Sequence, residues 1–209
     1  MRKVPADPGP RGPRIRTIFT RWVAAVSVGM LAGTLVSVST QQAAQAYSLN
    51  GCKWNTRDIS YYVPSPLVSY PVWRNASTKW GSLDATLTWR NIANPHIYGT
   101  NENRGNTVAW TGATRTRGTV QTPPSCPNGL FQTGQVEVVL NWTSISGYTA
   151  AQKEGVAVHE FGHALGLAHN STTSGGVPVA VMYPYDNLRH THNVLAPKTD
   201  DRNGVNAIY

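Results

Sequence analysis

The segment that decides the fold is VAVHEFGHALGLAH, residues 156–169. It contains three histidines, His159, His163 and His169, and a glutamate, Glu160, directly after the first of them. The question that this segment raises is whether it forms a metal site or a buried helix that happens to contain histidines.

The residues before this segment favour a helix that runs through its first half. Thr149, followed by Gln152 three positions later, is the pattern of a capping box at a helix start. Gly166 is placed to end the helix in a left-handed turn. The predicted apolar stripe of this helix consists of Val156, Phe161, Ala164 and Leu165. The sequence therefore predicts an amphipathic helix within residues 147–166.

On such a helix the two histidines of H-E-x-x-H lie four residues apart on one face, where both can bind one ion. A catalytic zinc site takes three protein ligands and a water molecule, so a third ligand is needed. His169 lies six residues beyond His163, and about 600° of continued helix would turn it to another face. Gly166 solves this by redirecting the chain. Glu160 is poorly placed to ligate the same ion and well placed to accept a proton from the metal-bound water. We therefore predict zinc on His159, His163 and His169, with Glu160 as the general base.

The rest of the chain predicts strands first and the histidine helix after them. Strands are expected at residues 59–63, 85–92, 106–114 and 135–142, and helices at residues 72–80 and 198–209. A capping role for Thr199 is expected in the last helix. The order favours a single domain of the mixed α/β (α+β) class.

The first 46 residues have the pattern of a secretory signal peptide. Residues 1–22 carry six basic residues and one acid, residues 23–40 carry no charge, and Ala44 and Ala46 form an A-x-A site. We expect cleavage after Ala46, which leaves a domain of residues 47–209; an uncleaved membrane anchor is the alternative. Most of the net charge of +8 then belongs to the leader, so the charge does not indicate nucleic-acid binding.

The two cysteines, Cys52 and Cys126, both lie in the predicted exported part. Extracellular compartments are oxidising, so we expect a disulfide between them. The alternative is that Cys52 caps the zinc as a thiolate.

The residues HEFGHALGLAH match the metzincin signature H-E-x-x-H-x-x-G-x-x-H, and the chain resembles that superfamily. Met182 looks like the metzincin methionine turn, and the Met-Tyr-Pro sequence that ends at Pro184 is similar to matrixins. KWNTRDISYYV and the tail LAPKTDDRNGVNAIY also resemble matrixins, so the likeness spans residues 53–209.

The resemblance implies a twisted sheet over the zinc helix and a small C-terminal subdomain with the methionine turn and a final helix. It also implies that Met182 and Gly166 support the zinc site, and that either Asp200 or Asp201 holds the methionine turn or a nearby N-terminus; ordinary helix capping is the alternative for these acids. The implied substrate is a protein or peptide in extended form, paired with an edge strand near residues 106–114. A core strand is the alternative for that segment.

The sequence departs from matrixins in three ways. It contains no PRCGxPD switch, its His96, His190 and His192 do not fit a structural-zinc set, and its few acids give no evident calcium site. We assign His190 and His192 to surface loops without chemistry.

The expected function is that of a secreted, monomeric zinc endopeptidase that binds neither nucleic acid nor, after cleavage of the leader, membranes. Two alternatives stay open. One is a secreted zinc hydrolase of a non-protein amide such as cell-wall material, and the other is a non-catalytic binding module stabilised by zinc.

Overall fold

The computed structural model describes residues 47–64 and 70–209, and the predicted leader lies outside these residues. The described residues form a five-stranded sheet in the order β2-β1-β3-β5-β4. Its strands are β1 (Asp58–Tyr62), β2 (Thr86–Trp89), β3 (Ile97–Glu102), β4 (Gly112–Thr116) and β5 (Val136–Asn141). β4 runs antiparallel to β5, and the other neighbours are parallel.

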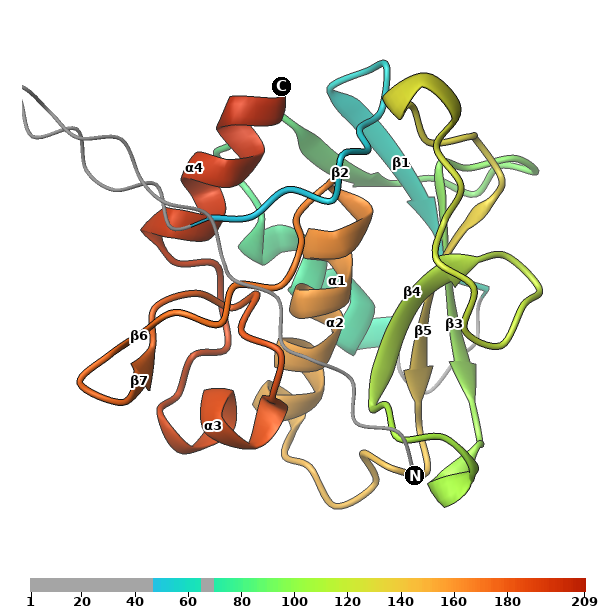
Figure 1. Cartoon of the computed structure of the whole chain (residues 1–209). Coiled ribbons are helices and arrows are strands. Elements are labelled where there is room, and N and C mark those ends of the chain that lie inside the picture. Colours follow the sequence, from blue (N-terminus) through green and yellow to red (C-terminus); the bar gives the residue numbers. More distant parts are fainter. Residues whose placement is uncertain (1–46, 65–69) are drawn as a thin grey trace, which may run out of the picture. The chain divides into compact units, whose positions relative to one another are not determined.

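Two long helices, α1 (Tyr70–Lys79) and α2 (Ala150–Ala164), lie side by side next to the sheet (Figure 1). Beyond α2 follow the β6–β7 hairpin (Thr173–Ser174 and Val177–Pro178), α3 (Asp186–Thr191) and α4 (Thr199–Ile208). Short 3-10 helices, η1 (Gly105–Thr107) and η2 (Pro127–Gly129), occur in two of the loops. The predicted mixed α/β class is therefore confirmed.

The core lies between the sheet and the two long helices. Three tryptophans and an aromatic residue of α2 are buried there, namely Trp54, Trp73, Trp80 and Phe161. Trp80 Nε1 donates a hydrogen bond to the Val158 carbonyl oxygen at 3.0 Å, and Trp54 Nε1 donates to the Ala164 carbonyl oxygen at 2.9 Å. Through these hydrogen bonds both indoles anchor α2, and their rings fill the core.

Within the five-stranded sheet, the sequence prediction was wrong at one strand and missed another; it also missed the short β6–β7 hairpin. The strand expected at residues 106–114 begins only at Gly112, because the chain before it turns through η1. Asn141 Nδ2 donates to the carbonyl oxygens of Gly105, at 2.9 Å, and of Trp110, at 3.3 Å, and so holds this loop in place.

The missed strand is β3, which lies between β1 and β5 near the centre of the sheet. Gly99 interrupts its short apolar pattern. A Cβ atom at Gly99 would lie 2.7 Å from Val63 Cγ2 and 3.2 Å from Trp73 Cε3, so the close packing of α1 against the sheet requires glycine.

A cluster of charged side chains joins β3, β4 and β5. The Arg115 guanidinium binds Glu137 Oε2 at 2.8 Å through Nε, binds Glu102 Oε1 through Nη2, and donates to the Val120 carbonyl oxygen at 3.1 Å. The hydrogen bond from Arg115 lowers the pKa of Glu102 to about 2. Because Arg115 is buried, this pairing is what makes its charge tolerable inside the sheet.

No helix in the part of the chain that the structure describes is long and apolar enough to cross a membrane.

Candidate metal centre

Helix α2 begins with the capping box that the sequence indicates. The Thr149 hydroxyl accepts a hydrogen bond from the Gln152 backbone N–H at 3.3 Å, and Gln152 Oε1 accepts one from the Thr149 N–H at 2.9 Å. From this start the helix continues to Ala164 and presents His159 and His163 together, with ring centroids 4.8 Å apart.

The chain leaves α2 through Gly166, which has a φ of +103°. A Cβ atom at this position would overlap the carbonyl oxygen of Cys52, so two separate constraints require glycine. After this turn His169 returns to the helix, and its ring centroid lies 4.7 Å from that of His163 and 5.2 Å from that of His159. One ring nitrogen from each of the three histidines lies within 4.8 Å of the other two.

The hydrogen bonds of two histidines fix which ring nitrogen is free. His159 Nδ1 lies 2.8 Å from the Val181 carbonyl oxygen, and His163 Nδ1 lies 2.8 Å from the Leu167 carbonyl oxygen. Because a carbonyl oxygen only accepts, each Nδ1 must carry the proton and donate it. The Nε2 atom of each ring is therefore left with a lone pair, which is the arrangement of a metal-binding histidine.

The distance between two of these nitrogens fits zinc. His159 Nε2 and His169 Nε2 are 3.2 Å apart. Two nitrogens that each lie about 2.1 Å from a tetrahedral zinc ion are separated by about 3.4 Å. Two ring nitrogens whose lone pairs point toward one ion can lie this close together, because the cation attracts both lone pairs. The residues present therefore fit a zinc ion.

Burial keeps the histidines neutral, as metal ligands must be. It lowers the pKa of His159 well below its ordinary value and lowers that of His163 to about 4. It also lowers the pKa of His169, which is less buried.

Glu160 lies in an environment suited to a general base. Burial raises its pKa to about 7, and a hydrogen bond from Thr114 opposes the rise. The Thr114 hydroxyl lies 3.0 Å from Glu160 Oε2 and 2.7 Å from the Glu160 carbonyl oxygen. A Cβ atom at Gly112 would lie 2.8 Å from Glu160 Cγ, so glycine there lets β4 approach the carboxylate. A carboxyl group with a pKa near neutrality can both accept and donate a proton at neutral pH.

Met182 is fully buried. A Cβ atom at Gly162 would overlap its sulfur, so the thioether packs directly against α2. Asp201 Oδ2 accepts the Val181 N–H at 2.8 Å, and Asp201 Oδ1 accepts the Met182 N–H at 3.2 Å. The Val181 carbonyl oxygen in turn accepts the hydrogen bond of His159 Nδ1. Asp201 therefore helps to position His159 by fixing the backbone of this turn.

Asp201 also starts α4. Its Oδ2 atom accepts the Lys198 N–H at 2.7 Å, so the carboxylate of Asp201, and not the expected Thr199, caps this helix. Asp200 accepts a hydrogen bond from Asn170 Nδ2 at 2.6 Å, beside the loop that follows His169.

Two cavities adjoin the histidine cluster. The larger, of about 590 Å³, is lined by residues 109–112, by residues 184–187 and Arg189, and by His159, Glu160 and His169. The smaller, of about 290 Å³, contains His163, His169, Thr114, Pro123 and Pro124. The three histidines and Glu160 thus line two cavities, and His169 belongs to both of them.

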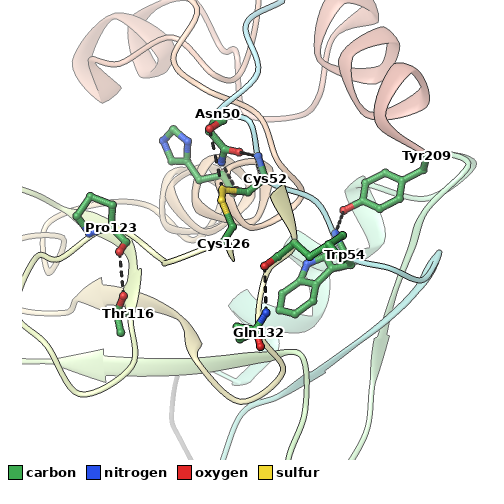
Figure 2. Close-up of a disulfide and its surroundings, with 10 residues drawn as sticks. Asn50, Cys52, Trp54, Thr116, Pro123, Cys126, Gln132 and Tyr209 are labelled. Atoms are coloured by element: carbon green, nitrogen blue, oxygen red, sulfur yellow. Dashed lines mark hydrogen bonds between the residues drawn. A yellow bond between two sulfur atoms is a disulfide. The ribbon is translucent and has the colours of Figure 1, made fainter. Parts of the chain in front are cut away.

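The disulfide expected between Cys52 and Cys126 is present (Figure 2). It ties the segment before β1 to the loop after β4, where the Thr116 hydroxyl donates to the Pro123 carbonyl oxygen at 2.8 Å. Beside the disulfide, Asn50 Nδ2 donates to the His163 carbonyl oxygen at 3.0 Å. The disulfide therefore supports one wall of the smaller cavity.

The remaining histidines lie apart from the cluster. His96 Nδ1 lies 2.8 Å from the Ser60 hydroxyl, and its ring packs on Trp54. His190 lies in α3 with its ring on Tyr148, so its assignment to a surface loop was wrong, whereas His192 is exposed just after that helix.

Comparison with known proteins identifies the family. The family model described as Matrixin matches residues 75–209. The chain belongs to the matrixin family. Matrixins are zinc metalloendopeptidases. Membership of this family does not favour the two alternative functions, a hydrolase of cell-wall material and a non-catalytic binding module.

Three curated matrixins illustrate the similarity. Human neutrophil collagenase is 41% identical over 95 residues, which is 40% of this chain and 18% of that protein. Human matrix metalloproteinase-20 is 46% identical over 54 residues, which is 26% of this chain and 10% of that protein. Rat matrix metalloproteinase-16 is 44% identical over 54 residues, which is 26% of this chain and 8% of that protein. The matched part of this matrixin thus covers less than a fifth of the length of these relatives.

Some residues around the centre were not predicted from the sequence. Thr114 and Gly112 lie in β4, and Arg189 lies in α3, far from the histidine segment along the chain. Their residue types fit many roles, so the sequence alone carried no signal for them.

Proposed function

We propose that this matrixin is a secreted zinc-dependent endopeptidase that hydrolyses peptide bonds with Glu160 as general base. The observation that carries the proposal is the set of three neutral histidines beside a buried glutamate in a cleft.

In this proposal His159, His163 and His169 hold the zinc ion through one ring nitrogen each. Zinc, when bound there, supplies a Lewis acid that lowers the pKa of a water molecule and polarises a peptide carbonyl group.

Glu160 accepts the proton of the attacking water and returns it to the amine of the leaving group. Thr114 engages Oε2, so Oε1 is the oxygen available for the proton. Thr114 also holds the carboxylate in one orientation, which spares the reaction the entropy of positioning it.

The substrate binds in extended form across the cleft. β4 is an edge strand of the sheet. Residues 109–112, which lead into β4 and include its first residue, line the larger cavity. An extended peptide can pair with the main chain of this segment, as in other proteins that bind peptides by strand addition.

Secretion is part of the proposal. The predicted signal peptide of residues 1–46 and the disulfide support it, because disulfides persist in oxidising compartments. The proposed mature domain comprises residues 47–209 and acts as a monomer.

The experiment is a digest of a peptide library and of purified cell wall by the zinc-loaded protein, read by mass spectrometry, with a chelated sample as control. We expect internal cleavage of peptides that stops on chelation and returns with zinc. We also expect Ala109→Pro to raise KM while zinc content stays unchanged, because proline removes a main-chain donor. Cleavage of cell-wall amides with intact peptides would overturn the proposal, and unchanged kinetics of the proline variant would overturn the pairing.

A further inference from the structure

Arg189 in α3 is a buried cation whose hydrogen-bonding groups are not all satisfied. Its side chain is 2% exposed. Nη1 donates to the Gly155 carbonyl oxygen of α2 at 3.2 Å, whereas Nε has no hydrogen-bond partner among the described residues. Buried guanidinium groups are normally paired, because removing the charge and its N–H groups from water is costly.

No carboxylate in the described part of the chain forms an ion pair with Arg189. The nearest acid along the chain, Asp186, accepts a hydrogen bond from the Tyr148 hydroxyl at 2.8 Å. Burial lowers the pKa of Arg189, and the charges of Glu160 and Asp186 oppose that shift. Arg189 is therefore within electrostatic reach of the metal centre but not neutralised by direct contact.

The cavity beside the metal centre connects Arg189 to the reacting atoms. Arg189 lines the cavity of about 590 Å³ that also contains His159, Glu160 and His169. Among the described residues that line this cavity, Arg189 is the only lysine or arginine. A planar guanidinium with an unsatisfied N–H is well suited to bind a carboxylate, which can take two parallel hydrogen bonds.

We propose that Arg189 selects a carboxylate on the peptide residue that occupies this cavity. The carboxylate is either the side chain of aspartate or glutamate, or the C-terminal carboxylate of a short peptide. This inference rests on the proposed peptidase activity and makes acidic peptides the favoured substrate class.

A purely structural role is the competing explanation. The hydrogen bond from Nη1 to Gly155 ties α3 to α2, and a buried arginine could serve only that purpose. The two explanations differ in what they predict for substrate charge, since a structural tie does not distinguish glutamate from glutamine.

The experiment uses the zinc-loaded protein and a set of peptides with blocked termini. The peptides differ only at the residue that occupies the cavity, which is glutamate, glutamine or leucine. This residue lies next to the cleaved bond, and the digest of the peptide library locates that bond. We expect kcat/KM for the glutamate peptide to exceed that for the glutamine peptide by about tenfold or more, as for a charge-assisted hydrogen bond. A second pair, a free-acid peptide and its amide, distinguishes a C-terminal carboxylate from a side-chain carboxylate.

Arg189→Gln is expected to abolish the preference, and Arg189→Lys to retain part of it. The matched control is Arg202→Gln, because Arg202 also donates to backbone carbonyl oxygens, those of Gly81 at 2.9 Å and Lys79 at 3.1 Å, but does not line the cavity. We expect this control to keep the preference of the wild type.

The wild type alone can overturn the inference, even if the Arg189 variants fail to fold. Equal kcat/KM for glutamate and glutamine, together with equal values for free acid and amide, would refute selection of a carboxylate. A preference that survives in Arg189→Gln would assign the selection to another residue and also refute the role of Arg189. Absence of all peptide cleavage would overturn the proposed function itself, which keeps the two failures distinct.

Discussion

Replacing Gly166 with alanine tests whether the turn after α2 builds the metal centre. Alanine at a φ of +103° stores strain of about 1–3 kcal/mol. The new Cβ atom would also overlap the carbonyl oxygen of Cys52, so the segment before β1 must move. We expect a total loss of about 3 kcal/mol, which lowers the Tm by about 6–12 °C in a domain of this size.

The same substitution should weaken zinc binding, because the turn places His169 next to His159 and His163. We expect a loss of about 10- to 100-fold in affinity, the range seen when groups that orient a ligand are altered. The assays are thermal unfolding of the zinc-loaded protein and zinc competition with a chromophoric chelator.

Gly118→Ala is the matched control. Gly118 has a φ of +77°, and a Cβ atom there would meet nothing within 4 Å. This control carries the backbone strain alone, so we expect a loss of about 1–2 kcal/mol and unchanged zinc affinity. The reasoning is refuted if Gly166→Ala unfolds no lower than the control and binds zinc as tightly as the wild type.

Two further predictions concern stability. Replacing Cys52 and Cys126 with serine should destabilise the zinc-loaded protein by about 4 kcal/mol, since the disulfide closes a loop of 74 residues; equal Tm values for this variant and the oxidised wild type would contradict the estimate. Glu102, with its pKa lowered to about 2, stabilises the fold above its unfolded pKa of 4.5 and loses this effect as pH falls toward 2. Denaturant unfolding between pH 6 and 3 should therefore show a steeper loss for the wild type than for Glu102→Gln, and parallel profiles would count against the role of Arg115.

Local patterns predicted the parts of the molecule that depend on neighbouring residues. The capping box at Thr149, the spacing of the histidines and the turn at Gly166 all act within one segment of the chain, so their physical requirements are visible in the sequence. The disulfide followed from the presence of only two cysteines in the predicted exported part.

The features that the sequence did not predict depend on contacts between distant segments. In the sequence Gly99 argues against a strand. Only the packing of α1 against it explains why a glycine stands inside β3. The loop before β4 was wrongly predicted as a strand. The hydrogen bonds that hold this loop come from the side chain of Asn141 in β5, and the local sequence does not reveal them. The proposed roles of Thr114 and Arg189 depend on the positions of β4 and α3 next to Glu160, which the sequence does not show.

Glu160→Gln tests the central claim most directly, with zinc content and peptide hydrolysis measured on the same preparation. The substitution leaves the three histidines in place and removes the group that accepts the proton. We predict one zinc ion per chain in both proteins, with kcat lowered by about 10²- to 10⁴-fold in the variant, the usual contribution of a general acid–base group. Full hydrolysis by the zinc-loaded variant would contradict the account.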